Sequence, residues 1–219
     1  MNRTVLRLAT ALAISTTALA APVAHACDPV ESAQAESERL RTLMAKSEAA
    51  YLDRNPIAAF YRGDFSDAGS LGDFSPASHE TERAAAMCDI AVLGTIDRAA
   101  LTASEQIAYD TFRYSKERVL AGTEPDVLRT ILALPLDHFR GLQGTYPSFS
   151  ATDGIMSFET VEDYADNVSR HEAYARMVED VIARFDTGIA QGITLPRLTV
   201  ELMIEQLDTQ LAAPEGENA

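Results

Sequence analysis

The four histidines are the first candidates for catalysis, because catalytic zinc is usually held by histidines, cysteines and carboxylates. They are His25, His79, His138 and His171. His79 and His171 each precede a glutamate, as in the His-Glu-x-x-His zinc helix, in which two histidines one turn apart bind the metal. Arg83 occupies the second histidine position in the first case and Ala175 in the second. Neither pair can be that motif, and we interpret both as parts of solvated helices.

Motifs for nucleophiles, nucleotides and calcium are also missing from the sequence. There is no Gly-x-Ser-x-Gly elbow, no Ser-x-x-Lys pair and no glycine-rich phosphate loop. Asp64, Asp67 and Asp73 lie near glycines, but a calcium loop needs acids at alternate positions and a closing glutamate. We therefore predict that these aspartates are turn residues and helix caps.

The beginning of the chain has the three regions of an export signal. Arg3 and Arg7 supply positive charge, Leu8–Ala20 is mostly apolar, and Ala24-His25-Ala26 is a small-x-small cleavage site. The apolar stretch is short and is interrupted by threonine and serine, unlike a membrane span. We predict a signal peptide over residues 1–26 and a periplasmic or secreted protein, with an uncleaved anchor as the alternative.

The two cysteines of the chain, Cys27 and Cys88, both bear on export. Cys27 would be the first mature residue, which is where a bacterial lipoprotein carries its lipid, but the leucine usual three residues earlier is Ala24 here. Cys27 could therefore be lipidated, free, or disulfide-bonded to Cys88 in an oxidising compartment. For Cys88 we favour a small buried side chain on a helix.

The charge of the chain excludes one class of partner. The formal net charge is −15, and removal of residues 1–26, which contain two arginines and no acids, would make the charge about −17. Such a surface repels phosphate backbones and anionic lipid headgroups. We therefore exclude nucleic acid as a partner, and we expect membrane contact only through a lipid on Cys27.

The elements that must position any site are predicted to be helices, because no alternating run of β-branched residues is long enough for a sheet. We predict an all-α fold of about six helices over residues 27–213 and a disordered tail over residues 214–219. Asp28-Pro29 is a helix start, and its helix should reach about Asp53.

Further helix boundaries follow from proline, glycine and capping signals. Ser75-Pro76 opens a helix that should end near Gly94, where a left-handed cap would fit. The residues Thr102 to Glu105 form a capping box, and the helix that they open should run to Ala121.

The second half of the chain begins with a long irregular connection, predicted from Leu134 to Ser157. A helix should then start at Thr160 and either continue to Thr187 or break near Ser169. The last helix should begin at Pro196. Its apolar residues lie close to one stripe and need a partner to pack against: Leu198, Leu202, Met203 and Leu207.

Five short segments, in this order and spacing, resemble the N-terminal portion of the bacterial domain-of-unknown-function 885 (DUF885) family. The segments are Asn55–Asp64, Leu71–Pro76, Leu134–Gly141, Phe158–Tyr164 and Gly188–Arg197. The resemblance implies a larger, often exported, α-helical fold. It also implies a likeness to zinc metallopeptidases, through a His-Glu…Pro-Gly-His segment in the C-terminal half of the family. This chain contains no such segment.

Three functional hypotheses remain. The first is an exported partial member of the family that lacks the zinc-binding half, has no peptidase activity itself and associates with a separately encoded C-terminal half or with itself. The second is a cell-envelope interaction module that uses exposed helix faces, and the third is a hydrolase with an unrecognised site. We expect no cofactor, since the resemblance implies zinc only in full-length relatives. No catalytic residue is assigned, and His138, within one of the resembling segments, is the weak candidate for a cleft residue.

Overall fold

The computed structural model describes residues 35–151 and 153–212, and these form eight α-helices, two 3-10 helices and no strand. The all-α prediction is therefore confirmed. In chain order the helices are α1 (Glu36–Arg54), α2 (Pro56–Phe60), α3 (Pro76–Leu93), η1 (Arg98–Ala100), α4 (Ala103–Gly122), α5 (Pro125–Ala133), η2 (Leu142–Gly144), α6 (Pro147–Ser150), α7 (Val161–Ala190) and α8 (Arg197–Ala212).

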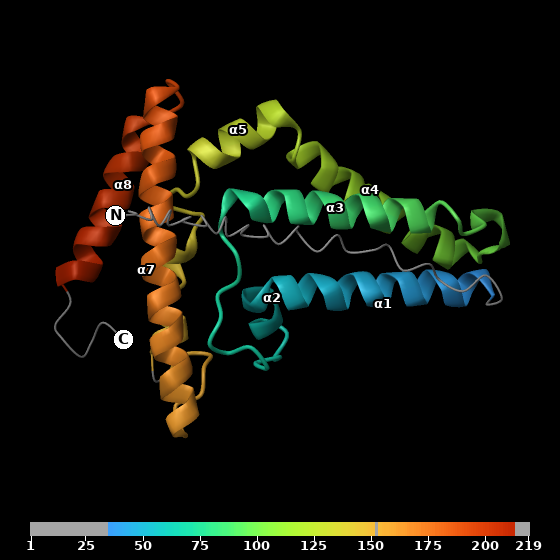
Figure 1. The fold of residues 1–219 in the computed structure, drawn as a ribbon, viewed down its shortest axis with the longest axis horizontal. Helices are drawn as coiled ribbons and strands as arrows, with labels where there is room; N and C mark the ends of the chain where they lie inside the picture. Colours follow the sequence, from blue (N-terminus) through green and yellow to red (C-terminus); the bar gives the residue numbers. More distant parts are fainter. Residues whose placement is uncertain (1–34, 152, 213–219) are drawn as a thin grey trace, which may run out of the picture.

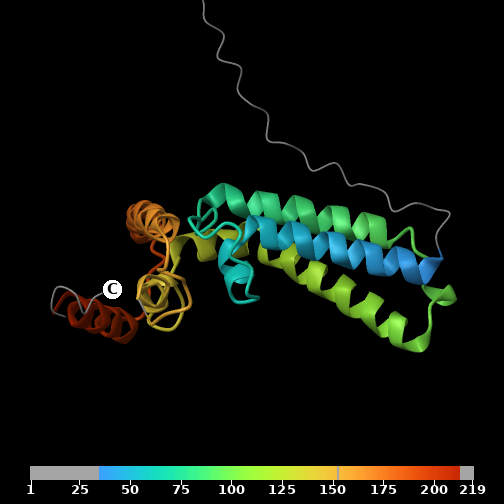
Figure 2. The same ribbon diagram turned by 90° about the horizontal axis from the view of Figure 1, so that it is seen from below.

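Helices α1, α3 and α4 lie side by side as one bundle, and α7 runs across the end of that bundle with α8 beyond it (Figures 1 and 2). The bundle has its own apolar core, because each helix contributes residues that it removes from water. The buried residues of this core are Leu40, Leu43, Val92, Leu93, Ile96, Leu101 and Tyr109. Tyr109 satisfies its hydroxyl by donating to the carbonyl of Leu93 at 3.2 Å.

A second core joins α2 to α7 through the irregular connection. Its buried residues are Phe60, Leu71, Leu142, Tyr146, Phe149, Met156 and Met177. Phe149 is completely buried, and its ring meets those of Phe60 and Tyr146 edge to face. The predicted irregular stretch is thus an ordered part of the core that contains only the short elements η2 and α6.

Capping boxes begin both α4 and α7; the sequence predicted the one at α4 and, for α7, only the helix start at Thr160. The Thr102 hydroxyl accepts a hydrogen bond from the Glu105 amide, and the Glu105 carboxylate accepts one from the Thr102 amide. Thr160 and Asp163 make the same reciprocal pair. Each pair satisfies amides that have no partner inside the helix. The aspartate prediction is also supported, since Asp64 and Asp73 accept from the backbone amides of Ser66 and Ser75.

One expectation about a helix end is wrong, and one open alternative about helix continuity is decided. Gly94 ends α3 with φ −63°, so it is not a left-handed cap. Gly192 after α7 is a left-handed cap, with φ +71°, and the amide of Ile193 donates to the carbonyl of Gly188 at 2.8 Å in a Schellman motif. Helix α7 continues through Ser169 without a break.

Helix α5 was not expected, although Pro125 at its first turn is an ordinary start signal. Other expectations fall outside the described residues: the signal peptide, the helix start at Asp28 and the tail over residues 214–219. Within residues 35–151 and 153–212, no helix combines the length and hydrophobicity that a membrane span requires.

Candidate functional site

His138, the weak candidate for a cleft residue, lies in the turn before η2 and touches α8 through its backbone. Its carbonyl oxygen accepts a hydrogen bond from Nε2 of Gln206 at 2.9 Å. Its ring packs on Phe139 with the centroids 4.0 Å apart, and its Nδ1 is buried without a partner. It is not among the residues that line the three pockets described below.

The other two histidines of the described residues, His79 and His171, lie on separate helices. His79 is on α3, where burial and the nearby positive charge of Arg184 lower its pKa, and the charge of Glu82 partly opposes them. His171 is on α7, with Nδ1 at 3.0 Å from the Tyr146 hydroxyl. No group of three histidines, cysteines or acids in the described part of the chain is placed to hold a metal ion.

The structure corrects our expectation for Cys88. Its side chain is half-buried rather than buried, and it takes part in a disulfide. Cys27 is the only other cysteine of the chain and lies outside the described residues.

Segments that resemble the DUF885 family line three pockets, two of which include residues of α7. The α1–α2 pocket, with a volume of about 350 Å³, is lined by residues of Asn55–Asp64 and Leu71–Pro76. The Phe74 pocket, of about 60 Å³, adds residues of Leu134–Gly141. The α5–α7 pocket, of about 360 Å³, includes Pro76 and Gln191, which belong to two of these segments. Four of the five segments, far apart in sequence, therefore contribute to these three pockets, and Phe74 lines two of them.

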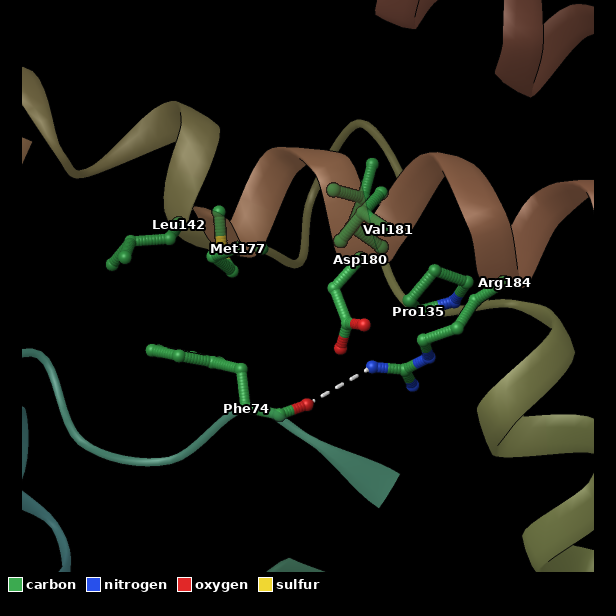
Figure 3. Close-up of a pocket in the computed structure, with 9 residues that line it drawn as sticks. Phe74, Pro135, Leu142, Met177, Asp180, Val181 and Arg184 are labelled. Carbon is green, nitrogen blue, oxygen red and sulfur yellow. Dashed lines mark hydrogen bonds between the residues drawn. The ribbon is translucent and has the colours of Figure 1, made fainter. Parts of the chain in front are cut away.

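Arg184 on α7 lies between two of these pockets and ties three parts of the chain together. Its guanidinium donates to the carbonyl oxygens of Leu132 at 3.0 Å, Ile131 at 3.3 Å and Phe74 at 3.4 Å. Figure 3 shows the bond to Phe74 beside the Asp180 side chain, which also lines the Phe74 pocket. Burial lowers the pKa of Arg184, and the charge of Asp180 opposes that effect. All three of these hydrogen bonds go to backbone carbonyls, which are therefore the main partners of the Arg184 guanidinium.

A polar cluster in the second core was missed by the sequence analysis. Arg170 on α7 is only 1% exposed, yet it donates to the carbonyl oxygens of Ala68 and Phe149. Tyr146 stacks on Tyr174 with their ring centroids 4.0 Å apart. No sequence motif could have predicted this cluster, because its members come from segments far apart in the chain: the α2–α3 loop, α6 and α7.

The outer face of α7 carries apolar residues that nothing in the described chain covers. Five of them recur at seven-residue intervals, and all are exposed: Val161, Val168, Ala175, Ile182 and Ile189. Three exposed acids accompany them, each four residues after a member of the row: Glu172, Glu179 and Asp186. We call the apolar row the α7 outer stripe. Helices that pack along one another carry apolar residues at two positions of each heptad, and this row supplies one of the two.

Helix α8 has a similar uncovered row and no buried residue at all. Its members follow a spacing of four, three and four residues, and they are 39%, 52%, 42% and 82% exposed: Val200, Ile204, Leu207 and Leu211. We call them the α8 stripe. Of the four residues that the sequence analysis named on this helix, Leu198 and Leu207 are exposed, whereas Leu202 and Met203 are half-buried.

A comparison with protein families identifies one match, to a model described as a bacterial protein of unknown function (DUF885). It covers residues 56–219, which is more than half of the chain and includes α2 to α8. No curated protein and no solved structure matches the chain.

Proposed function

Because the chain belongs to the DUF885 family, we propose that it is an exported, partial member that acts by binding a separately encoded helical polypeptide and has no peptidase activity of its own. The observation that carries this proposal is the α8 stripe. Four apolar side chains at 3–4 spacing are exposed on a helix that buries no residue of its own. Contiguous apolar surface of this kind marks interaction sites on soluble proteins.

The α7 outer stripe indicates the chemistry of the partner. Its apolar row would pack against an apolar stripe on a second helix, and its acidic row would then face the flanks of that helix. A partner helix with lysines or arginines on its flanks would complement Glu172, Glu179 and Asp186. A second copy of α7 would instead bring its own acids, in a chain whose net charge is already −15. We therefore favour a basic amphipathic helix of another polypeptide over self-association.

The lack of peptidase activity is inferred from residue identities. Arg83 and Ala175 stand where a zinc helix needs its second histidine. Catalytic zinc usually has three protein ligands and an open position for water. The hydrolase hypothesis would need a site assembled from scattered groups, and we do not favour it.

Export is supported by the n-region, apolar stretch and cleavage site of residues 1–26. The disulfide of Cys88 also suits an oxidising compartment such as the periplasm. A thioether-linked lipid and a disulfide cannot share the sulfur of Cys27. We therefore propose that Cys27 pairs with Cys88 and that the mature protein is not lipidated. Intact-mass spectrometry of protein from the envelope would show the mass of the oxidised chain after Ala26, and a diacylglycerol mass would contradict it.

The partner chemistry can be tested with two synthetic amphipathic helices that share one leucine stripe. One carries lysines on its flanks and the other carries glutamates. We expect the mature protein to bind the lysine helix and not the glutamate helix, as measured by fluorescence anisotropy. A scrambled lysine peptide of the same composition, which has no apolar stripe, should bind at least about tenfold more weakly.

Ile182→Glu in the α7 outer stripe separates packing from simple charge attraction. The substitution makes the protein more acidic, so an electrostatic complex with the lysine helix would become tighter. Docking through the stripe would become weaker, because a charge would enter an apolar contact. Tighter binding by the variant, or equal binding of the scrambled peptide, would contradict the proposal.

A further inference from the structure

The α5–α7 pocket combines an apolar wall with two arginines. Its apolar lining comes from the first turns of α3 and α5 and from the length of α5: Pro76, Pro125, Leu128, Leu132 and Ala133. Arg129 of α5 and Arg184 of α7 supply the charge, and Thr187 and Gln191 complete the lining. None of these residues is acidic. The volume of about 360 Å³ lies at the lower end of the range of roughly 300–1,000 Å³ for small-molecule sites.

The two arginines are incompletely neutralised by their surroundings. Arg129 has one carboxylate neighbour, Asp126, at 3.8 Å, and that carboxylate is almost fully exposed to water. Arg184 gives three hydrogen bonds to backbone carbonyls. Since a guanidinium has five N–H donors, some remain for another acceptor. Asp180 acts on Arg184 through its charge, but it lines the Phe74 pocket and not the α5–α7 pocket.

Although the chain has 33 acidic and only 18 basic residues, the lining of the α5–α7 pocket contains two arginines and no acid. Positive charge beside an apolar wall complements a ligand that is itself part anion and part hydrocarbon. Arg184 is held by carbonyls from two other segments, so its guanidinium would lose little conformational freedom on binding.

We propose that the α5–α7 pocket binds an alkyl or aromatic carboxylate, with the carboxylate on Arg129 and Arg184 and the apolar tail against Leu128 and Leu132. Such a group could come from a free fatty acid or from the C-terminus of a hydrophobic peptide. The proposal is independent of partner binding by α7 and α8, because its residues belong to neither exposed stripe.

Isothermal titration of the mature protein with octanoate, octan-1-ol and octylammonium tests the charge requirement. We expect saturable binding of octanoate, with the neutral alcohol at least about tenfold weaker and no binding of the cation. Equal binding of octanoate and octan-1-ol would overturn the proposal, since the hollow would then be recognising hydrocarbon alone. N-acetyl-leucyl-phenylalanine serves as the peptide arm: preference for it or for octanoate identifies the source of the carboxylate.

Arg129→Gln should weaken octanoate binding by about tenfold, and Arg184→Gln by at least as much. Arg184→Gln also removes three hydrogen bonds to the backbone, so its melting curve must be recorded alongside the titration. Arg129 makes no such bonds in the described chain, which makes Arg129→Gln the decisive variant. Arg118→Gln is the matched control, because it removes the same charge from an exposed site on α4 outside the pocket. Equal losses for Arg118→Gln and Arg129→Gln, or unchanged binding by Arg129→Gln, would overturn the proposal.

Discussion

Nε2 of Gln206 on α8 donates to the carbonyl oxygen of His138 at 2.9 Å, across 68 positions of sequence. One turn further along α8, Nε2 of Gln210 donates to the carbonyl of Gln143 at 2.9 Å. Both acceptors lie in the connection that builds the second core. Because α8 has no buried residue, these two amide side chains are important anchors of the helix, and His138 contributes to this contact through its backbone.

The double variant Gln206→Ala and Gln210→Ala should therefore loosen α8 while leaving the two cores intact. Each lost hydrogen bond should cost about 1 kcal/mol. Hydrogen exchange should accelerate in Arg197–Ala212 and stay unchanged in α1, α3 and α4. Thr209→Ala is the control, because its hydroxyl bonds only to the carbonyl of Glu205 within α8. Unchanged exchange across α8 in the double variant would show that other contacts hold this helix.

We expect truncation of the Arg170 side chain to destabilise the protein strongly. Its buried guanidinium satisfies the carbonyls of Ala68 and Phe149, and Arg170→Ala would leave these oxygens without their donor and open a cavity. We expect a loss of roughly 3 kcal/mol or more in the free energy of unfolding, measured by urea denaturation. Arg176→Ala, at an exposed site on the same helix, should change stability by less than about 0.5 kcal/mol. Similar values for the two variants would refute the anchoring role of Arg170.

The contribution of Glu82 to stability should depend on pH. Burial raises the pKa of Glu82, but hydrogen bonds from Arg54 at 2.9 Å and Asn55 at 3.3 Å and the charge of Arg54 outweigh burial, so the pKa is lowered. A carboxylate with a lowered pKa in the folded state stabilises the protein above its unfolded pKa, and this contribution disappears as the pH falls through the folded pKa. Glu82→Gln should therefore cost roughly 1 kcal/mol at pH 7 and almost nothing near pH 3. Urea denaturation at both pH values checks this, and an equal cost at both would contradict it.

We expect a side chain at position 188 to clash with its neighbours at the corner between α7 and α8. A Cβ at this position would lie 2.8 Å from the carbonyl oxygen of Ala133 and 2.9 Å from that of Ile193. Since both contacts are with backbone, α5 or the corner would have to shift. We expect Gly188→Ala to destabilise the protein by about 1–3 kcal/mol. A Cβ at Gly122 would meet nothing within 4 Å, so Gly122→Ala in a thermal melt is the control and should be neutral or slightly stabilising.

Removal of metal should leave the mature protein unchanged. His79, His138 and His171 come from three separate elements, and none has a histidine partner one turn away. We expect zinc to be lost on dialysis and peptide cleavage to stay at background with or without chelator. Stoichiometric zinc retained through dialysis, with chelator-sensitive cleavage lost in His138→Ala, would support the hydrolase hypothesis instead.

The sequence alone determined the features that depend on neighbours within one turn of helix. The capping box at Thr102 and the helix start at Thr160 were readable, because the side chains that satisfy the first free amides of each helix lie within its own first turn. The all-α class followed from the same local signals, and the family from short segments in order. The last helix was expected to leave its apolar residues uncovered; Leu198 and Leu207 are exposed, whereas Leu202 and Met203 are half-buried.

Only the tertiary structure decided which distant segments share a site. Arg184 could not be connected with Phe74 from the sequence, because 110 positions separate them and the contact is to a backbone carbonyl, which any residue type provides. The same reason hides Arg170 and the carbonyl of Ala68. Gly94 was expected to be a left-handed cap but is not, whereas Gly192 after α7 is one, since composition alone does not say which of several helix-ending glycines must turn the chain toward its next partner. Local hydrogen bonds are encoded by spacing, whereas the three pockets depend on how separate helices pack.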